Sequence, residues 1–241
     1  MSHSPQLRRN LVVRATRLVT PLMRRIIFGG DGLAGMEGAP PAAWIKLFIP
    51  TGSGDQAGRA YTVRRYDAAA RELAVDFVIH GDGPASRWAE RAAPGDVVQF
   101  GGPRSGFERR PDAEWLLLAG DETALPAILG ILESLPPATH ALAFVEIDHT
   151  EEQQAVKTAA PVEMTWLSRD GAPAGTTNLL ETATRRAPLP AGHGQFWLAG
   201  EAGVTRRIRG QLTEERGIPM SAVTAKGYWK IGEVDHRDRQ S

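Results

Sequence analysis

The sequence lacks cysteine altogether, since none of its 241 residues carries a thiol. This absence excludes disulfides, thiolate metal sites and cysteine-ligated iron–sulfur clusters. The six histidines are scattered, and no two stand four residues apart, the spacing that a helical metal site uses. We therefore expect no metal ion bound by the protein's own side chains.

The sequence also lacks a charge excess and a long apolar run. Lys plus Arg equals Asp plus Glu at 28 each, so the composition favours neither nucleic acid nor an anionic membrane as a partner. The N-terminal run LVVRATRLVT is interrupted by arginines and is too polar for a secretory signal. No run approaches the roughly 18 apolar residues of a membrane span. With 42% apolar and 23% charged residues, we expect a soluble, cytoplasmic protein.

The first half of the chain is rich in short β-type runs separated by turns. In residues 71–80, alternate positions from Leu73 to Ile79 are apolar, as on a half-buried strand. Six such runs favour an antiparallel barrel or sandwich. We expect a six-stranded antiparallel β-barrel domain over residues 1–112, with strands at 11–20, 23–30, 42–50, 59–67, 71–80 and 95–103.

The second half alternates strands with helices. EWLLLAG, residues 114–120, is continuously apolar, as in a strand buried on both faces. In 201–216, Val204, Ile208 and Leu212 recur every four residues, and Gly217 follows as a stop. Strand–helix alternation predicts a parallel-sheet α/β domain over residues 113–241, with further strands at 140–148, 162–168, 194–200 and 221–229.

The segment HGDGPASRWAERA, residues 80–92, favours an anion-binding turn. Its glycines permit a tight turn after a strand, and Pro84 suits the first position of a helix. The free amides and positive dipole end of such a helix suit a pyrophosphate, and Ser86 adds a hydroxyl. The alternative is an ordinary turn before a helix.

The stretch RAYTVR, residues 59–64, has a similar double interpretation. An arginine can bind phosphate through two hydrogen bonds, a tyrosine can lie against a conjugated ring, and a threonine can bond a ring nitrogen. The alternative is an exposed strand with a solvated face.

Taken in order, RAYTVR, DFVIHGDGPASRWA, GDVVQFGGPR, LLLAGDETALPAI, FWLAGEAG and GYWKIG resemble the siderophore-interacting protein family. These are FAD-dependent ferric-siderophore reductases, a branch of the ferredoxin–NADP reductase-like flavoproteins. The resemblance extends from about residue 10 to residue 232.

The resemblance implies an FAD site built mainly by the barrel. It implies that Tyr61 lies against the ring face of the flavin and that Thr62 lies near the flavin N5. Trp88 has a plain alternative as a core residue, and Val78 and Ala85 would contribute only backbone. The full set of implied FAD-binding residues is Arg59, Tyr61, Thr62, Val63, Arg64, Asp76, Val78, His80, Pro84, Ala85, Ser86, Trp88, Asp121, Thr123, Ala124, Trp229 and Gly232, with Glu122 in the same loop as Asp121.

The second domain of the family accepts NAD(P)H, which implies that Glu201 and Ala202 lie near the nicotinamide nucleotide. The glycines after strand 194–200 do not form a G-x-G-x-x-G fingerprint, so this is not a standard Rossmann phosphate loop. Arg206 and Arg207 either select a 2′-phosphate or form the solvated face of a helix, and we favour the second. NADH, NADPH and ferredoxin remain open as donors.

For the substrate, the resemblance points to Lys46 and Arg104 as cations that hold an anionic ferric siderophore. The alternative is a snorkelling lysine and a turn arginine. GGPRSG departs from the family's GGPRG, and Lys230 stands where many members carry arginine. The roles of Lys226 and Lys230 stay open.

The implied chemistry is hydride transfer from NAD(P)H to FAD, followed by single-electron transfer to iron(III), so that iron(II) is released from its hard oxygen ligands. No catalytic proton-transfer residue is required, because the protein supplies binding and orientation. Two alternatives are a general NAD(P)H:flavin or ferredoxin-type reductase and a non-catalytic ferric-siderophore or flavin binding protein. The absence of cysteine excludes a dithiol-linked flavin disulfide reductase.

Overall fold

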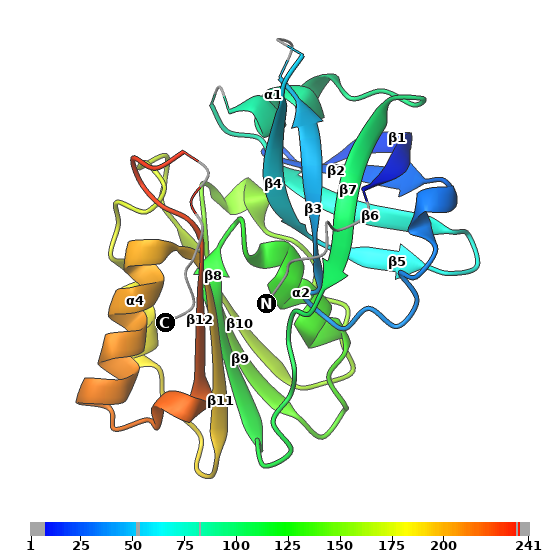
Figure 1. Ribbon diagram of the computed structural model, residues 1–241. Helices are drawn as coiled ribbons and strands as arrows, with labels where there is room; N and C mark the ends of the chain where they lie inside the picture. The colour runs from blue at the N-terminus through cyan, green and yellow to red at the C-terminus, as the bar shows by residue number, and fades with distance from the viewer. Residues whose placement is uncertain (1–7, 52–53, 82, 235, 237–241) are drawn as a thin grey trace, which may run out of the picture. The chain divides into compact units, whose positions relative to one another are not determined.

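The computed structural model describes residues 8–51, 54–81, 83–234 and 236, and it divides the chain into two units, Met1–Glu108 and Arg109–Ser241 (Figure 1). Each unit has its own sheet and is described by itself. Within the described residues, no helix has the length and apolar character needed to cross a membrane.

Unit 1 is built around one antiparallel sheet of seven strands in the order β4-β3-β7-β1-β2-β6-β5 (Figure 1). A short 3₁₀ turn, Asp31–Leu33, follows β2. The strands are β1 (Arg9–Thr20), β2 (Met23–Gly29), β3 (Trp44–Pro50), β4 (Gln56–Thr62), β5 (Arg65–Asp67), β6 (Glu72–Val78) and β7 (Val97–Arg104).

The expectation of six strands is wrong by one, because the run 59–67 forms two strands. β4 pairs with β3, whereas β5 pairs with β6 at the opposite end of the sheet order. Between them, the Val63 amide donates to the Ala43 carbonyl at 2.7 Å and the Arg64 amide donates to Ala74 at 3.0 Å. Two residues therefore connect the two edges of the sheet, which must curl for them to do so.

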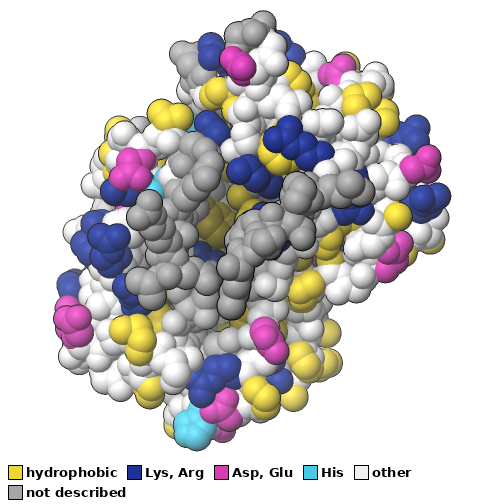
Figure 2. All heavy atoms as spheres, viewed as in Figure 1, with side chains coloured by type: hydrophobic (Ala, Val, Ile, Leu, Met, Phe, Trp, Pro, Cys, Tyr) yellow, Lys and Arg dark blue, Asp and Glu magenta, His cyan; other side chains and the backbone are white. Residues whose placement is uncertain are grey.

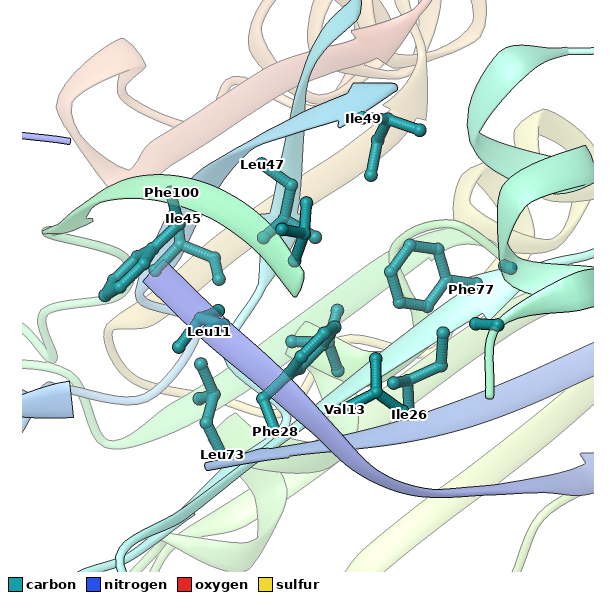
Figure 3. Packing of buried hydrophobic residues seen from close by; sticks show 14 of the residues in the cluster. Leu11, Val13, Ile26, Phe28, Ile45, Leu47, Ile49, Leu73, Phe77 and Phe100 are labelled. Atoms are coloured by element: carbon teal, nitrogen blue, oxygen red, sulfur yellow. The ribbon is translucent and has the colours of Figure 1, made fainter. Parts of the chain in front are cut away.

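The inside of this curled sheet is an apolar core (Figure 3). Leu73, Val75 and Phe77 are fully buried, which confirms the alternation expected for β6. The helix α1, Pro84–Arg91, begins with its proline in the first turn and buries Ala85 and Ala89 against the same core. The strand that precedes α1 and the helix itself are thus fixed by one cluster of side chains.

Unit 2 is a five-stranded parallel sheet in the order β10-β9-β8-β11-β12. Every residue of the central strand β8 is buried, as its continuous apolar run predicts. The strands are β8 (Trp115–Asp121), β9 (His140–Ile147), β10 (Val162–Ser168), β11 (Gly194–Glu201) and β12 (Val223–Trp229).

Helices lie on both faces of this sheet. α3 (Leu179–Arg186) and α4 (Ala202–Gly210) share a core cluster with β8 and β11, while α2 (Leu125–Glu133) lies on the other face (Figure 1). Val204, Ile208 and Leu212 are buried in that cluster, which confirms the spacing of four. The chain continues from α4 as a wider π-type turn, Gln211–Glu215, and 3₁₀ turns occur at Thr150–Glu152 and Met220–Ala222.

Gly120 shows how closely the elements approach at the carboxyl end of β8. A Cβ at this position would lie 2.5 Å from the Ala199 carbonyl oxygen and 2.6 Å from the Ala124 Cβ. The absence of a side chain therefore lets β11 and the start of α2 meet β8 at the edge where strand-end residues gather.

We predict that Gly120→Ala destabilises the protein by about 2 kcal/mol, because backbone atoms of β11 must move to admit the methyl group. Gly210→Ala is the matched control. Its Cβ would meet nothing closer than 4.0 Å, and alanine gains about 0.5 kcal/mol over glycine in a helix. Urea unfolding of both variants measures the difference. Equal stabilities would contradict the close approach at β8.

Candidate functional site

The segments expected to bind a flavin converge within unit 1. Tyr61 of β4 packs on Phe77 of β6 with ring centroids 4.3 Å apart, and Phe77 lies 5.8 Å from Trp88 of α1. Trp88 also stacks on Phe28 at 6.3 Å, so its ring packs within this aromatic row, while a contact with FAD stays a prediction. The Tyr61 ring is half-buried at the end of this aromatic row, and burial raises the pKa of its hydroxyl, which stays neutral.

A buried carboxylate fixes arginines on the other side of β6. Asp76 receives two hydrogen bonds from Arg25, Nε to Oδ1 at 2.6 Å and Nη2 to Oδ2 at 2.7 Å, and Arg64 Nε lies 4.0 Å from Oδ2. The Asp76 side chain is only 1% exposed. The carboxylate of Asp76 is therefore covered by two guanidinium groups, which it holds in place. Arg25 was missed by the sequence analysis, although its position opposite Asp76 on β2 is a cross-strand charge pair.

The turn between β6 and α1 is held by Ser86. Its Oγ accepts a hydrogen bond from the His80 amide at 3.0 Å, and Gly81 adopts a positive φ of 51°. Among the described residues, no side chain caps α1 and no acidic residue stands in its first turn. The first amides of a helix have no acceptor within the helix. His80 and Gly81 are exposed and Asp82 lies outside the described residues. Binding of an anion at this helix end stays a prediction.

The two expected substrate cations lie on one surface of unit 1. Ile45, Leu47 and Ile49 point into the core, so Trp44, Lys46 and Phe48 project from the opposite side of β3. We call the surface formed by Trp44, Lys46 and Phe48 with their paired neighbours on β4 and β7 the β3 face. Arg104 is paired with Trp44 across β3 and β7 and belongs to it. Lys and Arg side chains gather over β3 and β4 in Figure 2.

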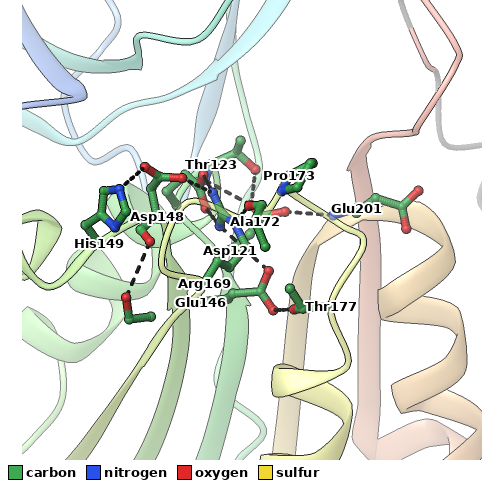
Figure 4. A network of polar contacts seen from close by, with 12 residues as sticks. Asp121, Thr123, Glu146, Asp148, His149, Arg169, Ala172, Pro173, Thr177 and Glu201 are labelled. Atoms are coloured by element: carbon green, nitrogen blue, oxygen red, sulfur yellow. Dashed lines mark hydrogen bonds and ion pairs between the residues drawn. The ribbon is translucent and has the colours of Figure 1, made fainter.

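In unit 2, Asp121 joins three strands at the carboxyl edge of the sheet (Figure 4). Its Oδ2 accepts from the Glu201 amide of β11 at 2.9 Å and from the Trp229 indole Nε1 of β12 at 2.8 Å. Its Oδ1 accepts from the amide and hydroxyl of Thr123. Asp121, Thr123 and Trp229 were predicted to belong to one site, and in the structure Thr123 and Trp229 both donate to the Asp121 carboxylate.

Burial, followed by the neighbouring Glu122 carboxylate, raises the pKa of Asp121 to about 6. The hydrogen bonds from Thr123 and Trp229 act in the opposite direction and lower it. At neutral pH the carboxylate is therefore charged, and it loses that charge under mildly acidic conditions.

Glu201 has a structural role at the start of α4. Its Oε2 accepts from the Val204 amide at 2.8 Å, and its Oε1 accepts from the Ile231 amide at 3.3 Å. The carboxylate therefore occupies the helix end that would otherwise attract an anion, and Ala202 beside it is buried. A pyrophosphate at this helix end would meet a negative charge, in agreement with the missing glycine fingerprint.

Arg169, which follows β10, is a second centre that the sequence analysis missed. It donates to both carboxylate oxygens of Glu122 at 2.7 Å and to Asp148 at 3.3 Å, and it lies 3.7 Å from Glu146 (Figure 4). Glu146 accepts from Thr177 at 2.8 Å, and burial raises its pKa. No local sequence signal marks Arg169, because its partners come from two other strands.

The remaining basic candidates of unit 2 are engaged with their own unit or exposed. Arg207 pairs with Glu181 of α3 at 2.6 Å, whereas Arg206 is exposed, which agrees with the solvated-face interpretation. Lys230 pairs with Glu233, and burial lowers the pKa of Lys226. Gly232 has a positive φ of 77°, which suits the turn that follows β12. Among the described side chains, no group of three His, Asp or Glu is placed to hold a metal ion.

Comparison with known proteins decides the family. Residues 113–232 match the model of the siderophore-interacting protein family, and residues 53–107 match the siderophore-interacting FAD-binding domain. The chain belongs to the siderophore-interacting protein family. It is 31% identical to the ferric vibriobactin reductase ViuB of Vibrio cholerae serotype O1 over 247 residues, which cover 92% of this chain and 90% of ViuB.

Solved structures agree with that assignment. The crystal structure of a siderophore utilization protein from T. fusca has a TM-score of 0.89 and 36% identity, covering 98% of this chain and 97% of its own. A ferredoxin NADP+ reductase from Neisseria gonorrhoeae, at 18% identity, covers 92% of this chain and 99% of its own with a TM-score of 0.69. The second likeness shows that this siderophore-interacting protein shares the fold of the ferredoxin–NADP reductases.

We predict that acidification stabilises the wild type relative to Asp121→Asn. The pKa of Asp121, about 6, exceeds the value of about 3.9 in an unfolded chain, so the folded state takes up a proton more readily. Stability from this group is present at low pH and is lost as pH rises through about 6. Between pH 7.5 and pH 5 the wild type should gain about 1.4 kcal/mol over the variant in urea unfolding.

Asp112 provides a control of opposite sign. Its hydrogen bond with Arg110 lowers its pKa, so any stability that it contributes is lost on acidification. If Asp121→Asn and the wild type kept a constant stability difference across this range, the raised pKa of Asp121 would be disproved.

Proposed function

We propose that the protein is an NAD(P)H-dependent flavoprotein reductase that reduces iron(III) in ferric siderophores and thereby releases iron(II). The observation that carries the proposal is the convergence of RAYTVR, DFVIH and GPASRW in unit 1. Tyr61 contacts Phe77, Arg64 faces Asp76, and Ser86 binds the His80 amide, so the three pieces form one site. The membership of the chain in a family with an FAD-binding domain supports it.

The donors and rings of unit 1 fit FAD. The uncapped start of α1 would offer amides to a pyrophosphate, and Arg59 of β4 and Arg64, which follows β4, would supply positive charge. Tyr61 presents a half-buried ring, which suits one face of a flavin. When bound, FAD would supply the conversion between the electron pair of a nicotinamide and the single electrons that iron(III) accepts.

The buried Asp76 has a defined part in this site. Asp76 accepts hydrogen bonds from Arg25 at 2.6 and 2.7 Å, and its Oδ2 lies 4.0 Å from Arg64 Nε. Its negative charge therefore offsets the repulsion between the two guanidinium groups and orients them. Arg25 thus joins Arg59 and Arg64 among the cations that we assign to the FAD phosphates. Thr62 and Val63, both buried at the end of β4, position the backbone beside the flavin ring.

Unit 2 would contribute Trp229, Thr123 and the backbone near Ala124 and Gly232 to the nucleotide site. Asp121 accepts a hydrogen bond from the Trp229 indole. Gly175 packs so closely against the indole ring that a Cβ on this glycine would lie 3.1 Å from it. These two contacts orient the tryptophan. We assign the electron donor as NADH or NADPH, with ferredoxin as the alternative. Glu201 and Ala202 would lie near the nicotinamide nucleotide because they form the start of α4. They would not form a phosphate-binding loop.

The substrate would be held by the β3 face. Lys46 and Arg104 supply positive charge for an anionic ferric complex, and no acidic residue occurs among the direct strand partners of Trp44, Lys46 and Phe48. Catalysis on this account needs no proton-transfer residue, because iron(II) binds hard anionic oxygen ligands far less tightly than iron(III).

We predict that Arg59→Gln weakens FAD binding by about tenfold or more, since it removes a charge-assisted phosphate contact. Arg65→Gln is the matched control, because Arg65 is exposed on β5 and pairs only weakly with Asp67 at 3.5 Å. Titration of the apoprotein with FAD, followed by flavin fluorescence, measures both. Equal affinities for the two variants would remove Arg59 from the site.

The function itself is tested anaerobically. NADPH or NADH is added to the FAD-loaded protein with a ferric siderophore and an iron(II) chelator, and the coloured iron(II) complex should form. Lys46→Ala should raise KM for an anionic substrate by about tenfold while leaving FAD content unchanged.

Other outcomes point to the alternatives. Oxidation of NAD(P)H with free flavin but not with any ferric siderophore would identify a general flavin reductase. Binding of a ferric siderophore without oxidation of NAD(P)H would identify a binding protein. Unchanged kinetics in Lys46→Ala would remove the β3 face as the substrate site.

A further inference from the structure

The strand order of unit 2 points to the part of its sheet that would hold the adenosine end of a dinucleotide. Numbered along the chain from β8, the order is 3-2-1-4-5, so the winding reverses between β8 and β11. In open parallel sheets, dinucleotides bind at the carboxyl ends of the strands beside such a reversal. An acidic residue about 20 residues after the first strand–helix turn then bonds the ribose 2′-hydroxyl of NAD, or an arginine nearby holds the 2′-phosphate of NADP. Asp148 directly follows β9 and stands at about that distance beyond the turn between β8 and α2.

Asp148 and Arg169 correspond to the two alternatives of this rule, and they are bound to each other. Arg169 directly follows β10, the strand paired with β9, and its Nη2 donates to Asp148 Oδ1 at 3.3 Å (Figure 4). The Asp148 side chain is 24% exposed, whereas the Arg169 side chain is only 3% exposed. The carboxylate can therefore accept a hydrogen bond from a ligand, while the guanidinium is closed off from solvent.

The nitrogens of Arg169 already face acceptors of unit 2. Its Nε donates to the Ala172 carbonyl at 3.1 Å, and Nη1 and Nη2 donate to the two carboxylate oxygens of Glu122 at 2.7 Å each. Nη1 also lies 3.7 Å from Glu146 Oε1. A 2′-phosphate could reach this guanidinium only by displacing a carboxylate that already binds it with good geometry.

The charge around Arg169 opposes a phosphate as well. Glu122 and Asp148 share the single positive charge of this guanidinium. His149, whose Nε2 lies 3.5 Å from Asp148 Oδ2, is the second basic group that contacts Asp148. A ribose 2′-phosphate carries about two negative charges and would be repelled by carboxylates that one guanidinium does not neutralise. A ribose 2′-hydroxyl is neutral and can donate to Asp148.

We propose that the protein binds NADH in preference to NADPH, because Asp148 accepts the 2′-hydroxyl of the adenosine ribose and Glu122 keeps Arg169 from a 2′-phosphate. The inference rests on the proposed function and specifies its electron donor. Asp148 is the residue that contacts the nucleotide, and Glu122 is a positioning residue that acts through Arg169. Arg206, exposed on α4, is the competing candidate for a 2′-phosphate contact.

Nucleotide binding is measured by calorimetry on the full chain with FAD added. The probes are NAD+ and NADP+, which differ only in the 2′-phosphate and do not reduce the flavin. The measurements are made at about pH 8, above the range in which histidines ordinarily gain a charge. We expect NAD+ to bind about thirtyfold tighter than NADP+, because like charges are brought together only with NADP+. The rates of flavin reduction by NADH and by NADPH should differ in the same direction.

Substitutions test the two residues separately. Asp148→Asn keeps the shape of the side chain but removes its charge, so the ratio of the NAD+ to the NADP+ affinity should fall by about tenfold. Glu122→Gln leaves Arg169 less neutralised and should tighten NADP+ binding by about three- to tenfold, with little change for NAD+. This gain of binding is a result that a merely structural role of Glu122 would not produce.

Glu163→Gln is the matched control for these variants. Glu163 lies near the amino end of β10, where it bonds His140, so the same loss of charge occurs at the opposite end of the same sheet. Neither nucleotide affinity should change in this variant by more than the error of the measurement.

Equal or tighter binding of NADP+ by the wild type would overturn the choice of donor, and loss of that binding in Arg206→Gln would then assign the phosphate contact to α4. An affinity ratio that stays constant in both Asp148→Asn and Glu122→Gln would overturn it too, as would absence of binding by both nucleotides. The anaerobic iron(II) assay measures turnover separately. A preference for NAD+ together with no iron(II) from any ferric siderophore would overturn the reductase function and leave the choice of nucleotide intact.

Discussion

The geometry of unit 1 depends on the two residues that connect β4 to β5. The Val63 amide donates to Ala43, just before β3, and the Arg64 amide donates to Ala74 of β6, and these two strands lie toward opposite ends of the sheet order. Because only these two residues separate β4 from β5, the sheet has to curl. The curl places the end of β4 against β6 and α1, so that Tyr61 meets Phe77 and Arg64 meets Asp76. Without this short connection, β4 and β5 would lie at separate edges of an open sheet.

Buried carboxylates organise the molecule in both units. Asp76, Asp121 and Glu201 were predicted to lie at cofactor sites, and each accepts hydrogen bonds from its own unit. A buried charge without partners costs several kcal/mol, so these groups are stable only where donors surround them. Asp76 orients the Arg25 guanidinium in unit 1, and Asp121 orients the Trp229 indole in unit 2. Removal of either carboxylate would therefore release the side chain that it holds.

A net charge of zero conceals an uneven distribution of charge. The carboxyl edge of the unit 2 sheet holds Asp121, and Glu122, Glu146 and Asp148 surround Arg169 there. The β3 face of unit 1, in contrast, has cations on aromatic rings and no acidic strand partner. The two units thus present opposite charges at these two places.

Most elements of the fold followed from the sequence. Period-two alternation located β6, a continuous apolar run located β8, and fourfold spacing located α4, because these patterns reflect burial of one face or of both. The same local rules joined β4 and β5 into one strand, since RAYTVRRYD has no residue that signals a change of partner. Only the hydrogen bonds of Val63 and Arg64 to different strands show the break.

The candidate site, like the fold, was predictable from the sequence only in part. The sequence by itself determined which residue types are present and in what order, and that order was sufficient for the family and for the aromatic and basic residues near each strand end. It did not determine which side chains face a ligand and which face one another. Arg25, Arg169 and the cation–ring pairs of the β3 face arise from contacts between segments far apart in the chain. Such contacts depend on strand register and on the curl of the sheet, which are properties of the folded chain and not of any local stretch of it.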